Sequence, residues 1–152
     1  MAYVTSEARQ QLLDAVAAAT DEIGVALSAL GDAYEQLDER SADELEERLF
    51  RPVQAAYARA QRTHSEFAGR HGLPTRTFTP AGHGAPSRGV RGFLDSAVEA
   101  VAQADTDLAE LQDSLLPVDV GDVELRAGLS EVRVLLGDVS ARAQQFMRLF
   151  GR

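Results

Sequence analysis

The sequence predicts an all-α protein folded as an antiparallel up-down-up-down four-helix bundle, and three observations lead to this prediction. Four segments repeat apolar residues three and four positions apart, which is the spacing of one face of an α-helix. Short connections at residues 38–41 and 116–121 join the first segment to the second and the third to the fourth, as in antiparallel neighbours. The aromatic share is only 6% and alanine is abundant, which favours closely packed helices over a β-sandwich.

We expect one domain over residues 1–152, with a long Gly/Pro-rich loop between the second and third helices. A chain of this length buries about 68 to 70% of the surface of its unfolded form, which is enough for a core without disulfides. The main alternative is a pair of long helical hairpins that must dimerise to close a core. The expected helices cover about residues 6–37, 42–71, 88–115 and 120–150.

The first helix has Thr5 or Ser6 as its candidate N-cap. Gly24 and Gly31 lie beside its apolar face, and glycine is unfavourable inside a helix, so we expect a neighbouring helix to approach closely there. The residues of the apolar face are Leu13, Val16, Thr20, Ile23, Leu27, Leu30, Tyr34 and Leu37.

The second helix is predicted to start at a capping box, in which Ser41 is followed three residues later by Glu44. Pro52 lies inside this helix and should kink it or force it to restart, because proline has no N–H and crowds the preceding turn. Gly72 suits the left-handed position that ends a helix. The apolar face consists of Leu49, Val53, Ala56, Ala60, Thr63 and Phe67.

The third and fourth helices show the same pattern. Ser87 is the candidate N-cap of the third helix, and Asp119 or Asp122 that of the fourth. The third apolar face consists of Val90, Leu94, Ala97, Val101, Ala104, Leu108, Leu111 and Leu115. The fourth consists of Leu125, Leu129, Val132, Leu136, Val139, Ala143, Phe146 and Phe150.

Composition narrows the function classes. The chain has a net charge of -9, which opposes nucleic-acid binding, and no cysteine, which excludes disulfides and thiol chemistry. No stretch is apolar enough for a membrane span and no signal segment is recognisable, so we expect a cytoplasmic protein without membrane contact.

The expected topology separates the charges. In an up-down-up-down bundle the long second connection shares one end with both termini, and no acidic residue lies between Glu66 and Asp95. We therefore expect a basic end opposite an acidic one. The predicted site at the basic end, for a small anion such as phosphate or a carboxylate, consists of Arg70, Arg76, Arg88, Arg91, His71 and His83. The alternative is that this loop is a solvated connector.

Metal and catalytic sites are not expected. His64 and His71 are seven residues apart, which separates them by about 10.5 Å along a straight helix, too far to ligate one ion. No histidine has a glutamate three residues before it, as di-iron bundles do, and no nucleophile has a base and an orienting group beside it. We predict no cofactor, no metal and no enzyme activity.

We therefore expect a non-enzymatic protein-interaction or adaptor module, with binding of a small anion as the alternative. The partner is either another protein or a second copy of the chain, since ends of opposite charge can meet head to tail. Leu12, Val25 and Phe50 lie outside the four apolar faces and are candidates for exposed apolar surface.

Overall fold

The computed structural model describes residues 2–82 and 89–150, and every regular element in these ranges is helical. This confirms the all-α prediction. None of the described helices is both long and apolar enough to cross a lipid bilayer. The elements are α1 (Ala2–Glu35), α2 (Glu39–Leu45), the π-helical turn η1 (Glu46–Phe50), α3 (Arg51–His71), α4 (Gly89–Asp113), α5 (Leu116–Val120), α6 (Val123–Leu136) and α7 (Val139–Phe150).

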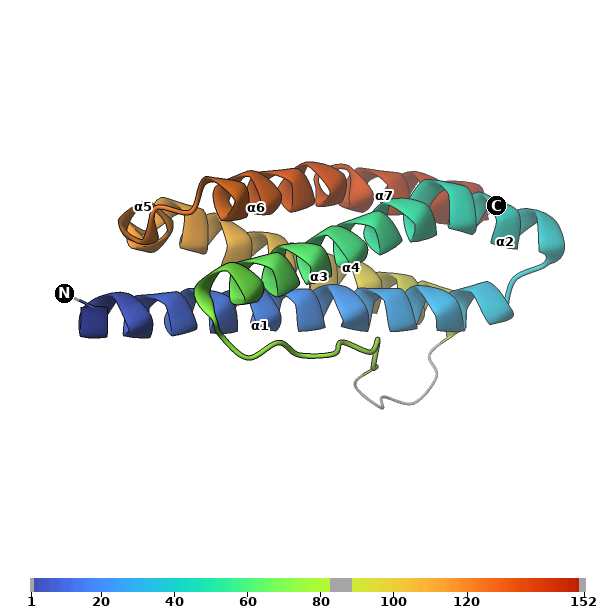
Figure 1. Cartoon of the computed structure of the whole chain (residues 1–152). Helices are drawn as coiled ribbons and strands as arrows, with labels where there is room; N and C mark the ends of the chain where they lie inside the picture. The colour runs from blue at the N-terminus through green and yellow to red at the C-terminus, as the bar shows by residue number, and fades with distance from the viewer. Residues whose placement is uncertain (1, 83–88, 151–152) are drawn as a thin grey trace.

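The long helices lie side by side along one axis of the molecule, and the short α5 lies at one end (Figure 1). α1 packs against α4 and α3, and α3 packs against α6. α2, η1 and α3 follow one another without a break in the chain, and α6 and α7 are separated by only two residues.

Contacts between side chains give the direction of α6 relative to α3. The end of α3 meets the start of α6, where Arg70 Nη2 lies 2.7 Å from Asp122 Oδ1. Farther back along α3, Arg59 Nε donates to Glu131 Oε2 at 2.6 Å. The two helices are therefore antiparallel.

α6 is antiparallel to α4 as well. Gln112 Nε2 donates to Ser130 Oγ at 3.0 Å, and Arg133 Nε donates to Asp105 Oδ1 at 2.9 Å. Since α6 runs opposite to both α3 and α4, those two helices run in the same direction (Figure 1). The up-down-up-down order predicted from the sequence is therefore wrong for the second and third long helices.

The length of the second connection explains this difference. Seventeen residues lie between His71 and Gly89, and an extended chain of that length reaches about 56 Å. A 21-residue helix such as α3 is only about 32 Å long. The connection can therefore carry the chain back along the whole of α3, and its described part runs alongside α1 (Figure 1).

The start of the second long helical segment also differs from the prediction. Asp38 is the N-cap, because its Oδ1 accepts a hydrogen bond from the Ser41 backbone N–H at 2.8 Å. Ser41 is thus inside α2, and the predicted capping box with Glu44 is wrong. Asp38 lies three residues before Ser41 and accepts from the free Ser41 N–H. The helix therefore starts at Glu39, earlier than predicted.

The chain stays helical through Pro52. The π-helical turn η1 directly precedes α3, in which Pro52 occupies the first turn. Pro52 has no N–H to offer the Arg48 carbonyl, four residues earlier. Arg142 of α7 donates to that carbonyl instead, with Nη1 at 3.4 Å from the oxygen.

The predicted end of one helix and the predicted start of another are confirmed, and one predicted helix is divided into two. Gly72 ends α3 with φ of 66°, and Asp122 caps α6 by accepting from the Leu125 N–H at 2.8 Å. The expected helix over 120–150 is interrupted after Leu136, so α7 starts anew at Val139. The predicted N-cap Ser87 lies outside the described residues.

The four apolar faces form the core, except near their ends. Every face residue from Leu13 to Leu30, from Leu49 to Phe67 and from Val90 to Leu111 is buried, as is every one from Leu125 to Phe146. The predictions fail at the ends of the faces, because Leu37 is only partly buried and three other residues are exposed. Those three are Tyr34, Leu115 and Phe150.

Close approach occurs at one of the two predicted glycines. A Cβ on Gly24 would lie 3.3 Å from the Tyr57 ring and 3.4 Å from Pro80 Cα, whereas one on Gly31 would meet nothing within 4 Å. The tightest approach among the described glycines is at Gly128, where a Cβ would lie 2.3 Å from Thr63 Oγ1. The absence of a side chain at Gly128 therefore lets α6 lie close to α3.

Candidate functional site

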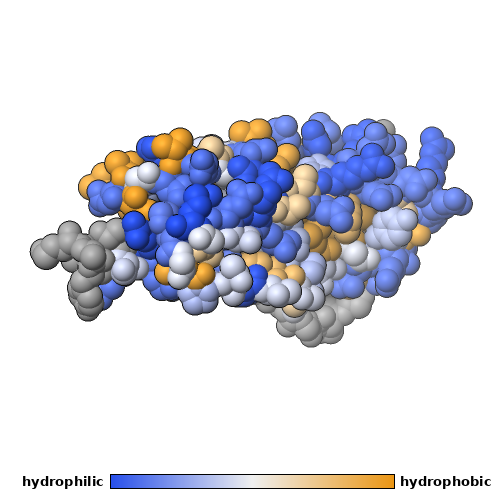
Figure 2. All heavy atoms as spheres, in the orientation of Figure 1, coloured by the Kyte–Doolittle hydropathy of each residue, from blue (hydrophilic) through white to orange (hydrophobic). Residues whose placement is uncertain are grey.

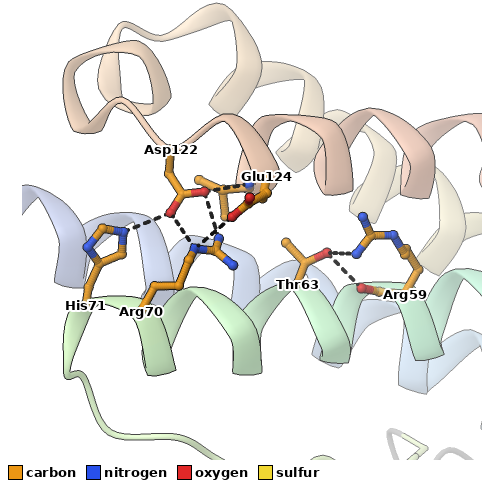
Figure 3. Close-up of polar contacts among 7 residues, drawn as sticks. Arg59, Thr63, Arg70, His71, Asp122 and Glu124 are labelled. Carbon is orange, nitrogen blue, oxygen red and sulfur yellow. Dashed lines mark hydrogen bonds and ion pairs between the residues drawn. The ribbon is translucent and has the colours of Figure 1, made fainter.

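The predicted site residues Arg70 and His71 belong to an ion-pair network between α3 and α6 (Figure 3). Arg70 donates from Nε and Nη2 to the two Asp122 oxygens, at 3.0 and 2.7 Å. His71 Nε2 lies 2.8 Å from Asp122 Oδ2, and Glu124 lies 3.3 Å from Arg70 Nε. Arg70 is therefore neutralised by carboxylates rather than available to a small anion.

The Asp122 carboxyl is the centre of this network, and its side chain is only 5% exposed. Burial raises its pKa, but hydrogen bonds from Arg70, the Leu125 N–H and His71 outweigh that effect and lower the pKa to about 2. The carboxylate therefore stays charged at any ordinary pH. It joins the last turn of α3 to the first turn of α6.

Arg76 lies elsewhere, on the connection that runs alongside α1. Its guanidinium pairs with Asp21 of α1 and stacks on Phe78, with Cζ 4.4 Å from the ring centroid. Phe78 is buried and contacts His64 edge-on, at 5.0 Å between centroids. These contacts anchor the described part of the connection, so that part is not a freely solvated loop.

His64 is buried beneath this anchored segment and lines a hollow with Asp14 and Asp21. Its Nδ1 has no hydrogen-bond partner among the described residues. Desolvation lowers its pKa below the usual value, Arg76 lowers it further, and Asp14 and Asp21 act in the opposite direction. These surroundings therefore favour the neutral form of the His64 ring.

Arg91 lies in the first turn of α4, in a shallow hollow shared with Gln144, Met147 and Arg148 of α7. Among the described residues, neither Arg91 nor Arg148 forms an ion pair. The other two predicted site residues, Arg88 and His83, lie outside the described residues.

The structure does not bring Arg70, Arg76 and Arg91 together. Because α3 and α4 run in the same direction, the end of α3 and the start of α4 lie toward opposite ends of the molecule (Figure 1). The expected separation into one acidic and one basic end fails for the same reason. The predicted topology places the connection before the fourth helix, with Asp122, at the end opposite Arg70, yet these two residues are in contact.

An apolar surface lies at the end of the molecule formed by α5. We define the α5-end surface as Leu115, Val118 and Val123, which are 73%, 58% and 66% exposed. Apolar residues gather over this end in Figure 2. Pro117, the second residue of α5, is buried instead, whereas the N-cap residue Leu115 and the helical residue Val118 are exposed.

A second apolar surface lies at the opposite end, at the close of α7. We define the α7-end surface as Leu149 and Phe150, which are 59% and 46% exposed. They line a groove between α7 and α2, together with Arg40 and Arg48. The Phe150 ring stacks on Phe146 at 6.1 Å between centroids.

The three residues predicted from the sequence to form exposed apolar surface do not belong to either of these two surfaces. Leu12 is fully buried, and Val25 and Phe50 are partly buried against the core. The sequence does contain a pattern that indicates exposed apolar residues: an apolar helical period that continues beyond the end of the helix. Leu115 keeps the period of α4 but lies between Ser114 and the Leu-Pro start of α5, where the helix has already ended.

Within the described ranges, no group of three or more His, Asp or Glu side chains is arranged to hold a metal ion. Comparison of the chain with protein-family models, with curated proteins and with solved structures finds no match.

Proposed function

We propose that this protein is a non-enzymatic interaction module that binds a protein partner through the α5-end surface. The observation that carries the proposal is the exposure of Leu115, the N-cap residue of α5, and of Val118 on α5, while Pro117 between them is buried. Contiguous apolar surface on a folded domain is typical of a contact with another protein.

The sequence pattern supports the same proposal. Leu115 continues the apolar face of α4, whose other members are buried. Exposing a leucine instead of burying it forgoes about 1.5 to 3 kcal/mol of stabilisation. A partner that covers Leu115 recovers part of that free energy.

Affinity capture from a lysate of the source cells tests this proposal with three baits. The first is the wild type, the second carries Leu115→Ser and Val118→Ser, and the third carries Val134→Ser. Val134 is the matched control because it is 77% exposed but lies outside the α5-end surface. Equal melting temperatures establish that all three baits are folded.

We expect a protein retained by the wild type and by the Val134→Ser bait but not by the double variant, and direct binding of that protein once purified. Identical capture by all three baits contradicts the proposal. So does capture that depends on Val134 as strongly as on the α5-end surface.

Binding of a small anion is the second candidate function. Of the predicted arginines, Arg91 is the one that favours it, because it shares a hollow with Arg148 and has no carboxylate partner among the described residues. A thermal-shift titration with phosphate and dicarboxylates, at matched ionic strength, tests this candidate. It predicts a saturable rise that Arg91→Gln abolishes, and a flat response of the wild type contradicts it.

A further inference from the structure

We propose that residues 73–82, which we call the strap, form a pH-sensitive cover over His64 that detaches when the His64 ring takes up a proton. The strap lines a hollow together with residues of α1 and with His64 of α3, and it runs beside α1 (Figure 1). This inference is independent of the proposed function, because the strap includes no residue of the α5-end surface.

The strap is attached through a few side chains and hardly at all through its backbone. Leu73 donates its N–H to the Ala68 carbonyl at the end of α3, and residues 74–82 form no backbone hydrogen bond within the described part of the chain. Arg76 pairs with Asp21, but these side chains are 47% and 48% exposed, and ion pairs in water stabilise little. A segment held by so few contacts can open locally while the helices stay folded.

Two apolar strap residues reach the helices. Phe78 is 8% exposed, and its ring meets the His64 ring edge-on at 5.0 Å between centroids. Pro80 lies against α1, where a Cβ on Gly24 would be 3.4 Å from the Pro80 Cα. The Phe78 contact couples the position of the strap to the state of the His64 ring.

The covered His64 ring is poorly placed to carry a charge. His64 is 3% exposed, and its Nδ1 is shielded from water and has no hydrogen-bond partner among the described residues. A protonated ring has an N–H on both nitrogens, so Nδ1 would become a buried donor without an acceptor. Water reaches the ring once Phe78 leaves it. Opening therefore favours the charged ring, and charging the ring favours opening.

The charges that act on His64 come from the strap and from α1. Desolvation lowers the pKa of His64, Arg76 of the strap lowers it further, and Asp14 and Asp21 of α1 raise it. Tyr57, two turns earlier on α3, stays neutral near pH 7 because burial raises the pKa of its phenol. Detachment of the strap removes the cover and the Arg76 charge together, and it leaves Asp21 without its partner. All three changes favour the protonated ring.

The linkage between proton and strap has a definite sign and an upper limit. The ring binds the proton more tightly in the open form. The ratio of open to closed strap is therefore lowest above about pH 7 and rises as the pH falls through about 6.5. Uptake of one proton per opening limits this rise to about tenfold for each pH unit.

A spin label on the strap tests this inference without altering Arg76 or Phe78. Thr79 is exposed and the chain has no cysteine, so Thr79→Cys carries a single nitroxide. The label is placed in the otherwise unchanged chain, in His64→Gln and in His71→Gln. His71 is the matched control, because it is the other described histidine and it contacts Asp122 at the start of α6. Electron paramagnetic resonance spectra from pH 7.5 to 5.5 measure the mobility of the label, and circular dichroism establishes that the helices stay folded.

We expect a mobile spectral component that is small at pH 7.5 and grows below about pH 6.5, by up to about tenfold per pH unit. His71→Gln should show the same growth. His64→Gln cannot be charged, so its mobile fraction should not change with pH. Phe78→Ala should free the label at every pH and supplies the spectrum of the detached strap.

A label that is equally immobile at pH 7.5 and at pH 5.5 overturns the inference. So does a growth of the mobile component that His64→Gln leaves unchanged, since a different group would then be titrating. If His64→Gln does not fold, NMR titration of the His64 ring in the unsubstituted protein decides instead. The ring should gain its proton at the pH where the strap is released, and a ring that stays neutral while the label becomes mobile contradicts the proposal.

Discussion

Arg70 and Asp122 form a two-pronged ion pair across 52 residues of sequence, with nitrogen–oxygen distances of 2.7 and 3.0 Å. Because Asp122 also caps α6 through the Leu125 N–H, one carboxylate both starts a helix and attaches it to α3. Removing this carboxylate should therefore affect more than the ion pair.

Asp122→Ala is expected to lower the free energy of unfolding by about 2 to 4 kcal/mol. Loss of an N-cap alone costs about 1 kcal/mol, and breaking a largely buried ion pair costs more. Asp122→Asn keeps an oxygen that can cap α6 and should cost less. Urea unfolding measures both, with the exposed Asp119→Ala as the control, and equal effects of Asp122→Ala and Asp119→Ala would contradict this account.

Acid should destabilise the protein through the same carboxyl. The pKa of Asp122 is about 2 in the folded protein, against an ordinary value of 3.8. A lowered pKa contributes stability that is complete above about pH 5 and is lost as the pH falls toward 2. Melting temperatures at pH 5, 4, 3 and 2 should fall more steeply for the wild type than for Asp122→Asn, and parallel curves would show that Asp122 does not contribute.

The lowered pKa of His64 predicts that stability depends on pH in a second, higher range. Desolvation lowers its folded pKa below 6.5, so the unfolded chain takes up the proton more readily than the folded one. Stability should therefore be complete above about pH 7 and decline as the pH falls through 6.5. His64→Gln removes this part of the decline between pH 7.5 and 5.5 in thermal melts, and an unchanged slope would refute the assignment.

Substitution by alanine should change the stability of the protein in opposite directions at Gly128 and at Gly31. A Cβ on Gly128 would lie 2.3 Å from Thr63 Oγ1, and Thr63 is held by hydrogen bonds to Arg59 at 2.8 and 2.9 Å. Gly128→Ala should therefore destabilise the protein by about 1 to 3 kcal/mol. Gly31→Ala meets nothing within 4 Å and should stabilise the helix by about 0.4 to 1 kcal/mol. Chemical denaturation of the two variants measures both effects, and a stabilising Gly128→Ala would show that α3 and α6 are less closely held.

The helical periods in the sequence were sufficient to predict the helices and most of the core. Faces such as Leu49 to Phe67 are apolar at the right spacing, and burial of that face follows directly. The direction of α4 was not predictable in this way. A connection of 17 residues reaches either end of α3, so its length permits both directions.

The predicted grouping of Arg70, Arg76 and Arg91 depended on that direction, and the structure does not bring these three residues together. Arg70 and Asp122 are 52 positions apart, and no local pattern predicts that they pair. The exposed apolar surfaces could not be predicted for a different reason. Leu115 and Phe150 keep the period of buried residues, and only the geometry of the helix ends shows that they leave the core.

Site-specific photo-cross-linking tests most directly the claim that the α5-end surface is a contact surface, because the chain has no cysteine of its own. Val118→Cys is labelled with a thiol-reactive photo-cross-linker and irradiated in a lysate of the source cells, with the exposed Val134→Cys as the control. The account predicts a protein that cross-links to the Val118→Cys protein and not to the Val134→Cys protein. The same cross-linked products from both positions, or none from Val118→Cys, would contradict it.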